Sequence, residues 1–479
     1  MPPAARPDQP RSPALSVPLD PPPGRDRRGR WLLLAAALYG LAYHVLLPPW
    51  MGEDEPWHLE YAHHVSTGNA PLGGGPFWLK AQIRERPLAH LQTMRRFPGV
   101  AAEEVDAFQR EVLASMWEHG FRERVDWAPR AVEPESFDQV SYSFTAMAQP
   151  PLYYLLLGAW LTPFAGADVE TRLRIARLPS LLTYLVVVLV TLRLARLVFA
   201  DESLALLAAA LVAFWPMHAR QAAVVNNDCL AKAVSAALLL LAARQLGPHA
   251  GRRDATWLAA LSGLALLTKT SSLGAVLVAG AVLAGRRFGQ RRSGRRKGLG
   301  LFLGVAGLVL AGLATWWVQY APVLPRTLEN LRLRLANGLS GESFRELGRT
   351  TAGAFNWYSR SLPEPLYSAL TAALVLTLAG LALALLRRRA GVERRLLYLC
   401  LAAVGVQLVL IVLRGVASGR YLVPALPALG VLCAAGLTAP FPERARGALL
   451  RAAAAVLFAA AAAFLWGGLV LHQYLVIGA

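Results

Sequence analysis

Long uninterrupted blocks of apolar residues constrain this chain more than any other feature. Clear examples lie at residues 31–49, 178–199, 299–318 and 448–471. Each block reaches or approaches the roughly 20 residues that a helix needs to cross a bilayer. Only 16% of the residues are charged, whereas an ordinary soluble protein carries about a quarter. The sequence therefore predicts an all-α polytopic membrane protein whose lipid-embedded helices account for most of its 479 residues.

The first apolar block is expected to stay in the mature protein as an anchor. It is too long for the apolar core of a signal peptide, and the segment Pro48-Pro49-Trp50 that follows it does not resemble a small-residue cleavage site. About twelve segments of the chain are apolar enough and long enough to be candidate spans. We therefore expect a bundle of about 11–13 transmembrane helices.

The formal net charge of +19 does not point to nucleic acid as a partner. Basic residues cluster at 25–30, 286–297 and 387–395, and each cluster adjoins an apolar block. Lys and Arg at such positions mark cytoplasmic loops and contact anionic lipid headgroups. We therefore expect membrane lipids, and no nucleic acid, as partners. The three cysteines, Cys229, Cys400 and Cys433, have neither the number nor the spacing of a disulfide framework or a metal site.

The positive-inside rule gives the chain an orientation and a division into regions. Residues 1–30 are rich in Pro and Arg, which predicts a disordered cytoplasmic tail. A transmembrane module follows over 31–320 and includes a large external loop, 51–149. A second external loop spans 321–364, and the C-terminal transmembrane helices occupy 365–479. This places the protein in the cell (inner) membrane, with a cytoplasmic N-terminus.

Between residues 149 and 286, the number of candidate spans conflicts with this orientation. Six candidates lie there, whereas passage from outside to inside needs an odd number. One short segment is therefore expected not to cross, either 151–164 or half of the pair at 256–286. The sequence does not say which.

The first external loop holds half of the acidic residues of the chain and contains a helical pattern. Val105, Phe108, Val112 and Met116 recur at helical spacing, with acidic residues on the other faces. This predicts an amphipathic helix. Its apolar face packs either on the membrane surface or on its own loop.

Three consecutive carboxylates, Glu53, Asp54 and Glu55, directly follow the first span. Like charges that are crowded together raise the pKa of at least one of them, which suits a general base or a metal ligand. A solvated acidic turn is the structural alternative.

The pair Asp54-Glu55 at the start of a large external loop resembles the GT-C superfamily of membrane glycosyltransferases. The similarity is to glycosyltransferase family 39, the branch of the protein O-mannosyltransferases and the aminoarabinose lipid A transferases. Five further segments match motifs of this family in the same order: QPPLYY at 149–154, RLPS at 177–180, NND at 226–228, LTK at 267–269 and GRYLVP at 419–424.

This resemblance implies a GT-C-like bundle with two large external loops. It also implies an enzyme that transfers a sugar from a polyprenyl-phosphate donor to a glycan, lipid or protein acceptor on the external face of the membrane. Asp54 is matched to the catalytic base, with Glu55 beside it. His58 stands where these relatives often carry Arg, and Gln149 replaces a charged residue, so the acceptor and any use of metal stay open.

The resemblance assigns the phosphate of the donor to Lys269, Arg420 and Tyr421. Arg can bind a phosphate in a bidentate manner and Lys acts as a point charge, so both can stabilise a leaving phosphate. Plain interfacial anchoring of these two cations is the structural alternative. The remaining candidate contacts to donor or acceptor are His58, Arg220, Asn227 and Asp228.

Two further alternatives stay open at this point. A divalent metal ion could be held by Asp54 and Asp228, because hard cations favour carboxylate oxygens. The chain could instead be a lipid-linked glycan flippase or another polytopic cell-envelope transporter, or a non-catalytic scaffold. Transporters commonly contain internal repeats, and we find none in the sequence.

Overall fold

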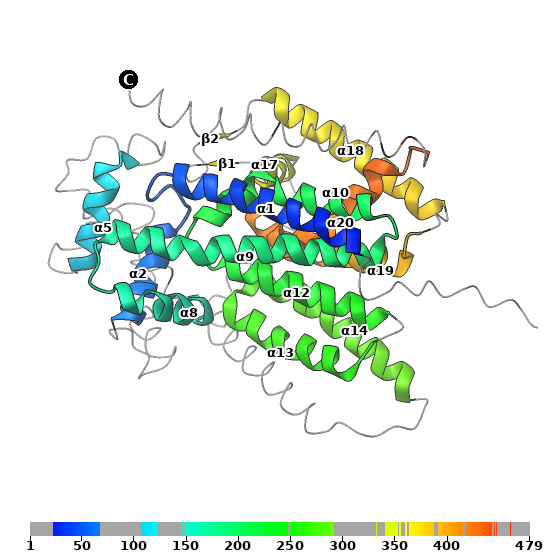
Figure 1. Cartoon of the computed structure of the whole chain (residues 1–479), viewed down its shortest axis with the longest axis horizontal. Helices are drawn as coiled ribbons and strands as arrows, with labels where there is room; N and C mark the ends of the chain where they lie inside the picture. The colour runs from blue at the N-terminus through cyan, green and yellow to red at the C-terminus, as the bar shows by residue number, and fades with distance from the viewer. Residues whose placement is uncertain are drawn as a thin grey trace, which may run out of the picture.

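A computed structural model gives the arrangement of the chain (Figure 1). It describes residues 23–67, 107–121, 149–247, 250–291, 341–352, 364–387, 391–414 and 418–442, two short strands and a few isolated positions between these ranges. Within this part of the chain the structure is helical, apart from strands β1 (Ala354–Phe355) and β2 (Arg360–Ser361), which pair antiparallel. The predicted apolar blocks at 299–318 and 448–471 lie outside the described residues.

Six described helices are long and apolar enough to cross a membrane. They are α1 (Pro23–Leu46), α9 (Val169–Val198), α12 (Asp228–Leu246), α18 (Glu364–Leu386), α19 (Arg394–Arg414) and the continuous unit of η6 (Gly419–Ala425) and α20 (Leu426–Thr438). The all-α polytopic class predicted from the sequence is confirmed. Helix α1 begins before the expected end of the cytoplasmic tail at residue 30.

A second group of helices is shorter or broken. Helix α10 (Glu202–Ala213) continues into α11 (Pro216–Arg220) and η4 (Gln221–Ala223) after a bend of 60°. The bend follows from Pro216, which cannot continue a helix but fits the first turn of a new one. The others are α8 (Leu152–Leu161) with η3 (Thr162–Phe164), α13 (Arg252–Thr268), η5 (Thr270–Ser272) and α14 (Leu273–Arg291).

Helix α8 fits the segment that was expected not to cross the membrane. Its 10 residues span only about 15 Å, roughly half of the hydrocarbon core of a bilayer. It packs along α2 (Glu55–Ser66), where Gly158 lies so close to Val65 that a side chain would collide. Which segment between 149 and 286 does not cross stays a prediction, because part of α14 is likewise among the shorter apolar helices.

The two ends of the bundle differ in chemistry. At one end the backbone N–H of Ala200 donates to the carbonyl of Gly391 over 2.8 Å, so the loops after α9 and α18 meet. Basic residues surround this end, among them Arg196, Arg244 and Arg394, and we call it the basic end. The opposite end, the site end, holds the end of α1, the starts of α9 and α12, the end of α13 and the start of η6. The alternating helices of Figure 1 therefore bring all of these termini together.

Small residues allow the helices of the core to approach closely. A side chain at Gly380 of α18 would collide with the backbone of Gly436 on α20, and one at Gly430 would collide with Ala208 of α10. Close contacts through small residues are a usual way of packing helices in a membrane, because lipid provides no hydrophobic force between them.

Helix α5 (Ala107–Glu118) packs on the protein. Its apolar residues Phe108, Val112 and Met116 are buried in one hydrophobic cluster with Trp50 and Leu173. The amphipathic helix predicted in the first external loop therefore exists, and its apolar face covers α2 and α9 at the site end (Figure 1). The contact with α2 agrees with the option that the helix packs on its own loop, whereas the contact with the spanning helix α9 was not expected. Val105 lies outside the described residues.

Part of the second external loop also packs on the site end. Helix α17 (Gly341–Ala352) contacts η6. The Thr350 hydroxyl accepts a hydrogen bond of 2.8 Å from the backbone N–H of Gly419, and a side chain at Gly419 would collide with Thr351. The start of η6 is thereby fixed in place beside α17.

Candidate functional site

The acidic turn after α1 has an unusual backbone. Trp50 and Asp54 both adopt positive φ angles, 68° and 61°, which cost non-glycine residues about 1–3 kcal/mol each. The indole N–H of Trp50 donates to the Ser115 hydroxyl of α5 over 2.9 Å, and a side chain at Gly52 would collide with Val224. The turn is therefore held against both α5 and the segment before α12.

Glu55 is fully buried and paired with Arg177 of α9. The guanidinium donates through Nε to Oε1 and through Nη2 to Oε2, both over 2.8 Å. Arg177 also donates to the carbonyls of Leu47 and Pro48, and Oε1 accepts the backbone N–H of Val225 over 3.0 Å. Both carboxylate oxygens of Glu55 and all three guanidinium nitrogens of Arg177 thus have hydrogen-bond partners. The pair therefore fastens the end of α1 to α9 and to the segment before α12.

Glu53 points to a different cation, Arg220 of α11. Both side chains are buried. The Glu53 carbonyl accepts a hydrogen bond of 3.3 Å from the amide of Asn226, whose own oxygen accepts the backbone N–H of Asp228 over 2.8 Å. The second carboxylate oxygen of Glu53 is buried without a partner.

Asp54 is the acidic residue of the turn that reaches solvent. As the N-cap residue of α2 it makes no cap hydrogen bond with its side chain. Its Oδ2 instead accepts a hydrogen bond of 2.7 Å from Nη1 of Arg420. The two side chains are 30% and 21% exposed. The Arg420 guanidinium also lies against Tyr421, with its carbon 5.2 Å from the ring centroid and Nη2 3.2 Å from the hydroxyl.

A second acid–base pair, Asp228 with Lys269, lies at the same end. The Lys269 ammonium is 2.8 Å from Asp228 Oδ1, and both side chains are almost completely buried. Lys269 caps α13 in an extended conformation, which separates it from the helix and directs it to the start of α12. Asp228 Oδ2 and both polar side-chain atoms of Asn227 are buried without partners.

His58 links the two pairs. Its ring feels the charges of Asp54, Lys269, Asp228 and Arg420, and its Nδ1 forms a hydrogen bond of 2.7 Å with the Tyr154 hydroxyl of α8. Burial lowers the pKa of His58 to about 3, so the ring is neutral at pH 7. The site thus presents one accessible carboxylate, two cations and a neutral imidazole.

Most of the residues selected from the sequence come together in this structure. Asp54, Arg420 and Tyr421 form one group, and Lys269, Asp228 and Asn227 form another, with His58 between them. Arg220 belongs to the neighbouring Glu53 pair. Glu55 differs from the expectation: its oxygens are taken up by Arg177 and the backbone, so it cannot accept a proton from a substrate without breaking the anchor.

The arrangement offers no site for a metal ion in the part of the chain that is described. Within these residues, no group of three His, Cys, Asp or Glu side chains is placed to hold one. Asp54 and Asp228, the two carboxylates considered for a divalent ion, each face a cation. The two cations, Lys269 and Arg420, suit an anionic ligand instead.

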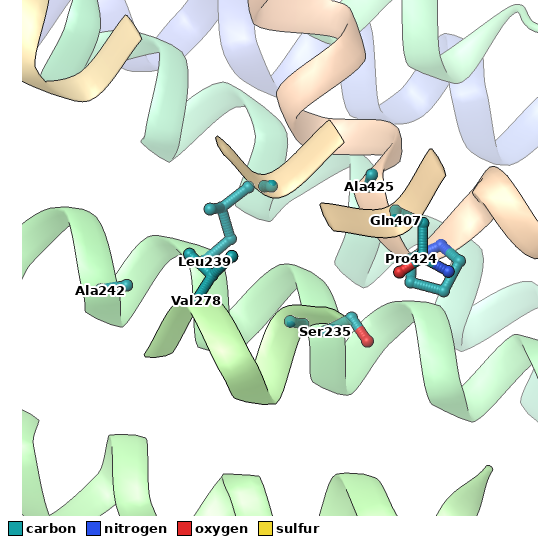
Figure 2. A pocket seen from close by; sticks show the side chains of 9 residues that line it. Ser235, Leu239, Ala242, Val278, Gln407, Pro424 and Ala425 are labelled. Atoms are coloured by element: carbon teal, nitrogen blue, oxygen red, sulfur yellow. The ribbon is translucent and has the colours of Figure 1, made fainter. Parts of the chain in front are cut away.

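A narrow cavity lies deeper in the bundle, between α12, α14, α19 and η6 (Figure 2). Its lining is mostly apolar, with Ser235 and Gln407 as the polar side chains. Figure 2 shows Leu239, Val278 and Pro424 around the same space. No charged residue lines it, so it is separate from the cluster of ion pairs.

The sequence of the chain matches one family over residues 37–429, a family described as predicted membrane protein (DUF2142). The chain belongs to this family. The DUF2142 match includes the acidic turn, the Asp228–Lys269 pair and Arg420, and ends within α20. No curated protein matches the chain.

The DUF2142 chain is also similar to solved structures of ArnT from Cupriavidus metallidurans. For the structure bound to undecaprenyl phosphate, the sequence identity is 18%, the TM-score is 0.48, and the alignment covers 92% of this chain and 65% of the ArnT chain. For the apo state the identity is 17%, the TM-score is 0.47, and the coverage is 93% and 66%. This chain therefore spans slightly less than two thirds of the length of ArnT.

Some residues of the site were not selected from the sequence. Arg177 was noted only as part of a motif, and its pairing with Glu55 joins residues that are far apart in the chain. Glu53 was not separated from its two acidic neighbours. Tyr154 and Lys232 were also missed. For Lys232 a signal was present, because a lone lysine inside an Ala- and Leu-rich span is a candidate functional residue by itself.

Proposed function

We propose that this protein is a GT-C glycosyltransferase that transfers a sugar from a polyprenyl-phosphate donor to an acceptor hydroxyl at the external face of the membrane. The observation that carries the proposal is the pairing of Asp54 with Arg420 next to the Lys269–Asp228 pair. A carboxylate with access to solvent and two cations at one end of a membrane bundle match the needs of this reaction. The motifs of the sequence, among them Asp54-Glu55, LTK at 267–269 and GRYLVP at 419–424, resemble those of glycosyltransferase family 39 and support the same reaction class.

In the proposed reaction, the acceptor oxygen forms a bond to the anomeric carbon of the sugar. The bond from that carbon to the phosphate oxygen breaks, and its electron pair leaves with the polyprenyl phosphate. The proton of the acceptor hydroxyl passes to the Asp54 carboxylate, which acts as general base. Asp54 suits this role because it is the acid of the turn that a hydroxyl can reach.

Arg420 and Lys269 stabilise the negative charge of the departing phosphate. Both are paired with carboxylates in this structure, so the donor phosphate must replace these partners. When Arg420 turns to the phosphate, it withdraws positive charge from Asp54. The Asp54 carboxylate is then available to the acceptor hydroxyl.

The orientation of the protein follows from its basic end. Arg196, Arg244 and Arg394 lie at the end opposite to the site, and under the positive-inside rule that end is cytoplasmic. The site then opens on the external side of the cell membrane. The helices α5 and α17 of the two external loops lie beside it, where they can contact a glycan, lipid or protein acceptor.

The substitution Asp54→Asn tests the proposed function. It keeps the shape of the side chain and removes its basicity, so sugar transfer should fall by about 10²–10⁴-fold, the usual contribution of a general base. The assay incubates the purified protein in lipid with a panel of radiolabelled polyprenyl-phosphate sugars, undecaprenyl phosphate among the carrier lipids, and identifies the labelled product.

A matched control is Asp168→Asn, because Asp168 is an exposed acid that caps α9 through Thr171 and lies outside the site. This variant should transfer sugar like the wild type. Wild-type activity in Asp54→Asn would show that Asp54 is not the base.

A further inference from the structure

Lys232 is a buried cation for which the proposed mechanism has no role. It lies in α12 and is completely excluded from solvent. Its ammonium donates one hydrogen bond, to Gln221 Oε1 over 3.1 Å. Among the residues that the structure describes, no carboxylate forms an ion pair with it. A buried ammonium within a membrane helix is costly unless its charge is compensated, so its presence calls for a reason.

Asp228 lies four residues before Lys232 on the same helix. Side chains at this spacing share one face of a helix, with Cβ atoms about 5–6 Å apart, and an acid that precedes a base is the favourable order. Asp228 and Lys232 therefore place opposite charges on one face of α12. Asp228 therefore lies between two lysines, of which Lys269 alone forms an ion pair with it.

The unpartnered carboxylate oxygen of Asp228 is a suitable acceptor for an unused N–H donor of Lys232. Oδ1 is 2.8 Å from the Lys269 ammonium, whereas Oδ2 is buried without a partner. An ammonium has three donors, and Gln221 takes up one of those on Lys232.

We propose that Lys232 is a reserve counter-ion of Asp228, a positioning residue that takes over this carboxylate when Lys269 turns to the donor phosphate. The proposal rests on the proposed function, in which Lys269 binds phosphate. If Lys232 were absent, the departure of Lys269 would leave a buried carboxylate without compensation, which is strongly unfavourable. Lys232 thus lowers the cost of releasing Lys269 and favours donor binding without touching the donor.

A double-mutant cycle on donor affinity tests this inference. The full-length protein is placed in nanodiscs and titrated with undecaprenyl phosphate, with Lys232→Met, Asp228→Asn and the double variant compared with the wild type. Lys232→Met should bind at least about tenfold more weakly, a loss of about 1.4 kcal/mol. In the Asp228→Asn background the same change should have no effect, because no carboxylate is left to compensate. Lys232→Arg should restore most of the affinity.

The control is Arg244→Met, since Arg244 lies on the same helix at the basic end and pairs with Asp254 over 3.0 Å. It should bind undecaprenyl phosphate as the wild type does. Equal losses from Lys232→Met in both backgrounds would reveal a merely structural role and overturn the inference. If Lys232→Met alone does not fold, Lys232→Gln within Asp228→Asn carries the test, and a loss of affinity there would also overturn it. A wild type that does not bind the lipid would contradict the proposed function itself.

Discussion

Asp54 and Glu55 are neighbours in the chain, but they belong to two different regions of the molecule. Glu55 lies in a dry anchor with Arg177, where two guanidinium nitrogens and a backbone N–H occupy its oxygens. Asp54 lies at the rim of the site, 30% exposed, with one hydrogen bond to Arg420. The left-handed backbone at Asp54 accompanies this division, because its side chain caps no helix N–H and is available to Arg420.

This comparison shows that a cluster of acidic residues in the sequence indicates a candidate site. The cluster does not indicate which of the carboxylates is structural and which is reactive. A buried carboxylate whose oxygens all accept hydrogen bonds stabilises the fold. Its removal leaves the partner cation buried without a counter-charge. A carboxylate with access to solvent and a cation that can be drawn away is able to take up a proton. Two adjacent residues with similar side chains therefore have different roles, one structural and one proposed to be catalytic. The same acid-to-amide substitution at each position distinguishes these roles.

The largest effect is expected from Glu55→Gln. The change leaves Arg177 buried with two backbone carbonyls and no counter-charge, so the free energy of unfolding should fall by about 3–5 kcal/mol. Reversible unfolding in mixed micelles measures this loss. Glu364→Gln is the matched control, because the Arg349–Glu364 pair is exposed and should contribute at most about 1 kcal/mol. Equal stability of Glu55→Gln and wild type would show that the anchor does not stabilise the fold.

Much of this architecture could be predicted from the sequence. The apolar blocks specify the spans directly, because a backbone in lipid must satisfy its own hydrogen bonds and therefore forms helices. The basic clusters specify which ends of the helices lie together. The acidic turn and the cations at 269 and 420 were selected through the order of their motifs, and the structure brings them to one end of the bundle. The metal alternative was left open, and the cations that face Asp54 and Asp228 now argue against it.

The different roles of Glu53, Asp54 and Glu55 within the acidic turn could not be predicted from the sequence. These roles depend on Arg177 and Arg220, which reach Glu55 and Glu53 from distant helices, and no local pattern encodes such a meeting. The packing of α5 has the same cause: its amphipathic pattern requires an apolar surface but does not say whether lipid or protein supplies it. Lys232 differs from these cases, because a lone lysine in an apolar span is a signal that the sequence alone contains.

The next effect is a pH dependence of stability that arises from His58, which is buried near the Asp54–Arg420 and Asp228–Lys269 pairs. Burial lowers its pKa from 6.5 in the unfolded chain to about 3 in the folded protein. Between these values the unfolded chain binds a proton that the folded protein excludes, so stability falls as the pH falls, by about 1.4 kcal/mol per pH unit. Above pH 7 both states are neutral, and His58 contributes no slope.

His58→Asn should remove this slope between pH 6 and pH 4. The measurement compares the unfolding free energy of variant and wild type across that range, and the difference between the two curves isolates His58 from the other titrating groups. His119→Asn serves as the control, since His119 is partly exposed and pairs with Glu170 over 2.8 Å. Parallel curves for His58→Asn and wild type would mean that the ring is hydrated, and that the site is more open than the structure shows.

The smallest effect on stability is expected from Asp54→Asn, although this change should abolish most sugar transfer. The Asp54–Arg420 pair is partly exposed, and such pairs contribute about 0–1 kcal/mol. Arg420 also keeps its contact with Tyr421 after the change, so no buried charge is stranded. The unfolding free energy of Asp54→Asn in mixed micelles should therefore lie within about 1 kcal/mol of the wild type. A loss as large as that of Glu55→Gln would make Asp54 a second anchor, and the loss of sugar transfer in Asp54→Asn could then no longer be assigned to a missing base.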